Sequence, residues 1–102
     1  LENVWADTTE PVDTHAATAA LEGYPALDLP SSPDQLVTVF EEPDRPQPRL
    51  DRDRDRGMGV GVGGLQTTDG GVQFNCLAHN TVRGAAGASV LNGELLLDRG
   101  YL

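Results

Sequence analysis

The chain has 102 residues, and its 16 acidic and seven basic residues give it a formal net charge of −9. This acidic balance argues against binding to nucleic-acid phosphates, which requires basic surface. A single cysteine excludes an intramolecular disulfide, and the sequence has neither a secretory signal nor an apolar run long enough to span a bilayer. We therefore expect a soluble cytoplasmic protein with no nucleic-acid and no membrane partner.

Composition also predicts that the chain is part of a larger protein and that its source is halophilic. Only 38% of its residues are hydrophobic, it holds 12 glycines and seven prolines, and it starts without methionine, so we expect a fragment of a larger protein. All basic residues are arginines. An acidic surface with arginine as its sole cation is typical of adaptation to high salt, which screens the repulsion among carboxylates, and predicts a halophilic source.

The spacing of apolar residues, together with proline and glycine, predicts a mixture of strands and helices. Pro11 and Gly23 delimit an alanine-rich helix, and the sequence from Thr68 to Gly71 has the composition of a hairpin turn between antiparallel strands. The expected elements are a strand over 1–7, a helix over 12–22, an extended loop over 24–33, a strand over 36–40, a loop over 41–56, strands over 58–65 and 72–78, and a helix over 82–97.

Glycine alternates with apolar residues from Met58 to Leu65, which reduces one face of this strand to bare backbone. Another segment must pack closely on that face. The letters also fit the dinucleotide pattern G-x-G-x-x-G, but that motif needs a helix at its last glycine, whereas a turn follows here. We therefore interpret these glycines as sheet packing.

Aspartate and arginine alternate from Asp51 to Arg56. Carboxylates at alternate positions resemble the start of a calcium loop, but the interleaved arginines and the missing downstream glycine and glutamate argue against a metal site. We expect a solvated or interfacial network of salt bridges. Just upstream, Arg45 and Arg49 bracket a stiff Pro-Gln-Pro segment that could hold two guanidinium groups for an anion or for a subunit contact, and both alternatives stay open.

Three polar residues near the end of the last strand are candidates for chemistry. Cys76 and His79 could form a nucleophile and base, but Cys76 lies on the apolar side of its strand pattern, so we predict a structural cysteine and an exposed histidine at the strand end. His15 is likewise expected to be exposed, on its helix. Asn80 could cap the following helix or present its amide to a carboxamide-bearing ligand, and the small residues of 84–88 would let a cofactor or neighbouring segment approach.

Three separated motifs, over residues 45–52, 57–63 and 79–96, resemble in order and spacing the C-terminal end of aspartate-semialdehyde dehydrogenases of the archaeal-like branch. The resemblance spans at least residues 25–102 and implies an α+β fold. Residues 1–81 would form the C-terminal part of the catalytic and dimerisation domain, with an antiparallel-rich sheet and a flanking helix. Residues 82–102 would form a terminal helix that packs back on a Rossmann-type NADP domain lying upstream.

This family uses NADPH to reduce aspartyl phosphate to aspartate semialdehyde, in lysine, threonine and methionine biosynthesis, or runs the reverse oxidation. In both directions the reaction passes through an acyl-thioester on a catalytic cysteine, with a histidine as acid and base. The resemblance implies that the catalytic cysteine and histidine lie upstream, so the fragment alone would be inactive. Asn80, and beside it Thr81, match the position that binds NADP in the family. A homodimer or homotetramer is also implied, with the glycine-rich strand and residues 45–56 as candidate contacts.

Two functions of other kinds stay open on the sequence. A malonyl-CoA reductase of the same superfamily shares this C-terminal pattern, and the substrate-binding residues that would distinguish it lie upstream. A non-enzymatic acidic interaction module is the other alternative, and it would fold and bind a partner by itself.

Overall fold

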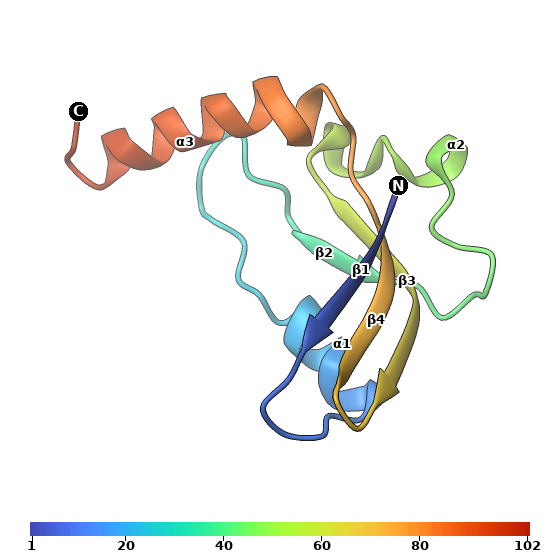
Figure 1. Ribbon diagram of the computed structural model, residues 1–102. Helices are drawn as coiled ribbons and strands as arrows, with labels where there is room; N and C mark the ends of the chain where they lie inside the picture. Colours follow the sequence, from blue (N-terminus) through green and yellow to red (C-terminus); the bar gives the residue numbers. More distant parts are fainter.

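The computed structural model describes all 102 residues and contains one four-stranded mixed sheet (Figure 1). Its strands follow the order β1-β4-β3-β2; β4 pairs antiparallel with both β1 and β3, and β2 runs parallel to β3. This largely antiparallel sheet with helices beside it confirms the α+β expectation. The strands are β1 (Glu2–Asp7), β2 (Val37–Val39), β3 (Val60–Thr68) and β4 (Gly71–Leu77), and the α-helices are α1 (Thr14–Glu22), α2 (Pro48–Asp51) and α3 (Gly87–Asp98).

The hairpin of β3 and β4 forms as the turn residues predict. Thr68 pairs with Gly71 across the two-residue turn, and the register shifts between Gly63 and Gln66, where Gly64 adopts a positive φ of 61°. Glycine adopts this backbone conformation at little cost, so the bulge falls where a side chain would be strained. The strand predicted over 1–7 is also confirmed as β1, which lies at the edge of the sheet.

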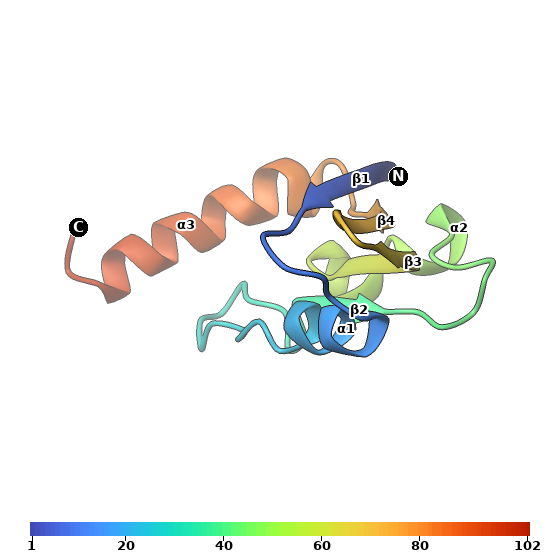
Figure 2. The same ribbon diagram turned by 60° about the horizontal axis from the view of Figure 1, so that its bottom comes forward.

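Helix α1 packs against β2 and β3, while α3 extends away from the sheet (Figure 2). α1 begins at Thr14, two residues later than predicted, because the Asp13 carboxylate caps it by accepting a hydrogen bond from Ala16 N–H at 2.7 Å. Gly23 ends it as predicted. None of the helices combines the length and the apolar composition needed to cross a membrane.

The prediction of an irregular loop over 41–56 is wrong. This segment contains α2 and a 3₁₀ turn, η1 (Arg54–Gly57). Pro48 occupies the first turn of α2, where its missing N–H costs nothing, and the Asp51 carboxylate accepts a hydrogen bond from Gln47 N–H at 2.8 Å at the start of the helix. One aspartate of the repeat thus organises the backbone that precedes it.

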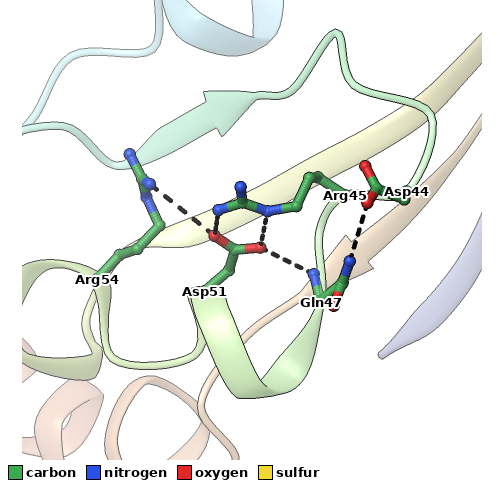
Figure 3. A network of polar contacts seen from close by, with 5 residues as sticks. All are labelled: Asp44, Arg45, Gln47, Asp51 and Arg54. Carbon is green, nitrogen blue, oxygen red and sulfur yellow. Dashed lines mark hydrogen bonds and ion pairs between the residues drawn. The ribbon is translucent and has the colours of Figure 1, made fainter.

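Asp51 is also the centre of a polar network (Figure 3), and the sequence did not predict that this residue is buried. Its side chain is fully buried and accepts hydrogen bonds from Arg45 Nε, at 2.8 Å, and from Arg45 Nη2. Arg54 lies farther off, with its Nη1 atom 4.0 Å from the same carboxylate. Hydrogen bonding from Arg45 holds the pKa of Asp51 below its usual value against the opposing effect of burial. The expected network of salt bridges is therefore centred on a buried residue, Asp51.

The bare face of β3 is covered by the segment that Asp51 organises. A Cβ built on Gly63 would collide with the Arg45 carbonyl oxygen, and one on Gly61 would lie 3.1 Å from the Phe40 ring and 3.2 Å from Pro46 Cβ. The predicted close packing is confirmed. The chain itself fills this space, so the glycine face is covered within the chain. The glycine-rich strand stays a predicted subunit contact.

The hydrophobic core is thin. Fourteen of the 102 residues are buried. The buried hydrophobic residues that form the core are Ala17, Met58, Val62, Leu77 and Leu91. Leu91 is the part of α3 that reaches the core, whereas Val90, Leu96 and Leu97 of the same helix are exposed. Much of the apolar surface of α3 therefore faces away from the sheet.

We predict that Gly63→Ala lowers the free energy of unfolding by about 3 kcal/mol, because the added methyl group must displace the Arg45 backbone. Gly93→Ala is the matched control: a Cβ there meets nothing within 4 Å, and alanine in a helix should add about 0.5–1 kcal/mol. Urea unfolding of both variants measures the difference. Equal stability of the two variants would contradict the packing argument.

We predict that Asp51→Asn lowers the free energy of unfolding by about 2 kcal/mol at neutral pH, because it removes the charge that Arg45 binds. The folded-state pKa of Asp51 is depressed, so its contribution is present above about pH 4 and is lost as the pH falls through that folded-state pKa. The difference between wild type and variant should therefore shrink in acid.

Urea unfolding between neutral and acidic pH tests this dependence. Asp53→Asn serves as the control, because the Asp53 side chain is 74% exposed and belongs to the same repeat. It should change stability by less than about 0.5 kcal/mol. A difference between wild type and Asp51→Asn that stays constant down to low pH would refute the assignment.

Candidate functional site

The junction between β4 and α3 is a wide helical turn. The carbonyl oxygen of His79 accepts a hydrogen bond from Gly84 N–H, and that of Thr81 accepts one from Ala86 N–H, both at 2.9 Å. These bonds span five residues, which is the π-helical spacing, and the turn η2 (Val82–Ala86) leads directly into α3. Single π-helical turns are frequent at functional sites. The predicted helix over 82–97 is thus present, with an irregular first turn.

His79 holds this turn with its ring. The Nδ1 atom accepts hydrogen bonds from Thr81 N–H at 3.3 Å and Val82 N–H at 3.2 Å, and the Thr81 hydroxyl lies 3.3 Å away. Because Nδ1 is the acceptor, the neutral ring carries its proton on Nε2, which lies 3.9 Å from the Asp53 carboxylate. The expectation of an exposed strand-end histidine is wrong: the ring is half-buried and caps the turn.

Asn80 lies inside the turn that His79 closes, and its side chain is exposed. The capping alternative for Asn80 is not realised, because the ring of His79 takes the backbone N–H groups at the start of the turn. The Asn80 amide makes no hydrogen bond within the chain, and its Oδ1 atom lies 3.7 Å from where a Cβ on Gly84 would stand. Both its donor and its acceptor are therefore available to an external group.

Two hollows of about 260 and 280 Å³ flank Asn80, and both are lined by Leu1, Ala78 and His79. Thr81 lines the first and Gly84 the second. The turn therefore presents the Asn80 amide between two recesses.

The small residues after Asn80 serve two purposes. Gly84, Ala85 and Ala86 are exposed, as a site of close approach requires. Gly87 has an internal role, because a Cβ there would collide with the sulfur of Met58. The exposed small residues thus lie on the turn itself, and tight packing against the chain begins at the first residue of α3.

Of the remaining sequence candidates, Cys76 lines the second hollow, and the others lie apart from this turn or are already engaged. Burial raises the pKa of the half-buried Cys76 thiol, which disfavours the thiolate form and agrees with a structural cysteine. His15 is exposed, as predicted, and lines a groove of about 550 Å³ between α1 and the β2–β3 edge. Arg45 is bound to Asp51, so the anion frame of Arg45 and Arg49 is not realised. No group of three or more His, Cys, Asp and Glu side chains is placed to hold a metal ion.

The chain matches no protein-family model. Curated relatives nevertheless align along almost its whole length. It is 52% identical over 98 residues to an aspartate-semialdehyde dehydrogenase of Archaeoglobus fulgidus and 44% identical over 99 residues to one of Saccharomyces cerevisiae. These alignments cover 94% and 95% of this chain, and 28% and 27% of the two relatives.

A solved structure gives the same result. The crystal structure of aspartate semialdehyde dehydrogenase with NADP from Candida albicans matches with a TM-score of 0.74 at 37% identity. The match covers 92% of this chain and 28% of that chain. The chain is thus homologous, along nearly all of its own length, to little more than a quarter of an aspartate-semialdehyde dehydrogenase.

Proposed function

We propose that this chain is part of an NADP-dependent aspartate-semialdehyde dehydrogenase, which reduces aspartyl phosphate to aspartate semialdehyde with release of phosphate. The observation that carries the proposal is the 52% identity over 98 residues with the Archaeoglobus enzyme. The nucleophilic cysteine and the histidine base belong to residues outside this chain, since Cys76 is a structural thiol and the His79 ring is committed to its turn. The 102 residues alone are therefore inactive.

Within the whole enzyme, the turn after β4 contributes to the NADP site. The Asn80 amide has a free donor and a free acceptor, the pair that a carboxamide or ribose of the cofactor requires. Thr81 is exposed beside it and offers a hydroxyl. NADP supplies the hydride chemistry when bound, and the role of this chain is to bind and orient it.

The exposed apolar side chains of α3 support a second part of the proposal. Val90, Leu96 and Leu97 are 56%, 43% and 65% exposed, which is unfavourable for a helix that stays in water. We infer that residues 82–102 pack on a Rossmann-type NADP domain, and that residues 1–81 belong to the catalytic and dimerisation domain of a cytoplasmic homodimer or homotetramer. The net charge of −9 without lysine supports a halophilic member of the archaeal-like branch, serving lysine, threonine and methionine synthesis.

The full-length protein that contains these residues tests the function directly. It should reduce NADP when given aspartate semialdehyde and phosphate, which is the reverse reaction, and it should show little activity with malonyl-CoA and NADPH. Reduction of malonyl-CoA without turnover of aspartate semialdehyde would replace the proposed substrate. Absence of both activities would reject the proposed function.

We predict that Asn80→Ala in the full-length enzyme raises the KM for NADP by about tenfold, the factor expected from the loss of about 1.4 kcal/mol of hydrogen bonding. Asn3→Ala is the matched control, because Asn3 is an exposed asparagine on the edge strand β1. Steady-state kinetics at varied NADP measure both variants. An unchanged KM in Asn80→Ala would remove Asn80 from the cofactor site.

A further inference from the structure

The position of Asn80 is fixed by the residue that precedes it. His79 accepts three hydrogen bonds from the backbone that follows Asn80. Its ring accepts from the N–H groups of Thr81 and Val82, and its carbonyl oxygen accepts from Gly84 N–H. The Asn80 side chain makes no hydrogen bond within the chain, so its own amide does not fix the position of the residue. The first two N–H groups after Asn80 are therefore held by the acceptor at His79 Nδ1, in addition to the backbone hydrogen bonds of the turn.

We infer that His79 is a positioning residue for the cofactor: its Nδ1 atom holds the turn that presents Asn80, so it sets the affinity for NADP without touching the reacting atoms. This inference rests on the proposed function. The half-buried ring is placed for this role by β4, which ends at Leu77, and its Nε2 atom faces the exposed Asp53 at 3.9 Å. A solvated contact of this length contributes little free energy, which leaves Nδ1 as the effective atom.

The two ring nitrogens can be separated by substitution. In His79→Asn the amide oxygen stands near the position of Nδ1 and can accept the same backbone hydrogen bonds. In His79→Gln the amide reaches toward the position of Nε2, and the acceptor at Nδ1 is lost. The two variants are both polar amides, so they differ mainly in which ring nitrogen they replace.

The test is a fluorescence titration of the full-length enzyme with NADPH, combined with steady-state kinetics. His79→Gln should raise the Kd for NADPH by about fivefold, the factor that corresponds to a lost helix cap, while kcat at saturating cofactor changes by less than about twofold. His79→Asn should bind NADPH nearly as tightly as wild type. His15→Gln, the exposed histidine of α1, is the control and should leave the Kd unchanged.

Equal NADPH affinity in wild type, His79→Gln and His79→Asn would overturn the inference and leave the proposed function intact. An equal loss of affinity in both variants, together with a fall in kcat and in melting temperature, would also overturn it, because it would indicate general damage to the fold. A wild-type enzyme that does not bind NADPH would reject the proposed function, and the inference with it.

Discussion

The buried carboxylate of Asp51 is the constraint on which the rest of the structure depends. A charge removed from water must be paired and hydrogen-bonded, and Asp51 meets this need with the Arg45 guanidinium and the Gln47 backbone. Meeting it closes the chain between Arg45 and Asp51 into one compact unit. In that unit the Arg45 carbonyl and Pro46 lie on the glycine face of β3. A side chain at Gly63 would collide with the Arg45 carbonyl, and one at Gly61 would make tight contacts with Pro46.

The residues that follow this compact unit connect it to the candidate site. Two residues beyond Asp51, the Asp53 side chain faces Nε2 of His79, and the backbone then turns through Asp55 and Arg56, which both have positive φ, before it enters β3. This conformation is uncommon for residues other than glycine, although aspartate adopts it more readily than most. His79 thus lies beside the loop that follows Asp51, with its Nε2 atom 3.9 Å from the Asp53 carboxylate.

Local patterns predicted the elements whose causes are local. The hairpin at Asp69–Gly70, the end of α1 at Gly23 and the close packing on the glycine strand each follow from residues adjacent in sequence. The failures share another origin. Asp51 reads as one more member of an exposed charge repeat, and the alternating pattern does not distinguish it from Asp53, although Arg45, six residues upstream, binds it in a buried position. His79 did leave a signal, since a side-chain acceptor two or three residues before a helical turn is typical of capping.

The free amide of Asn80 and the exposed face of α3 make physical sense together. The exposed Asn80 side chain makes no hydrogen bond that stabilises the fold. The His79 ring and a π-helical turn nevertheless fix the backbone at this position. Helix α3 likewise exposes Val90 and Leu97 to water, and the fold offers only a small core to cover its apolar side chains. Under the proposed function both features have one explanation: the turn and the helix are one side of a cofactor cleft, and the apolar surface of α3 is covered by the domain that forms the other side.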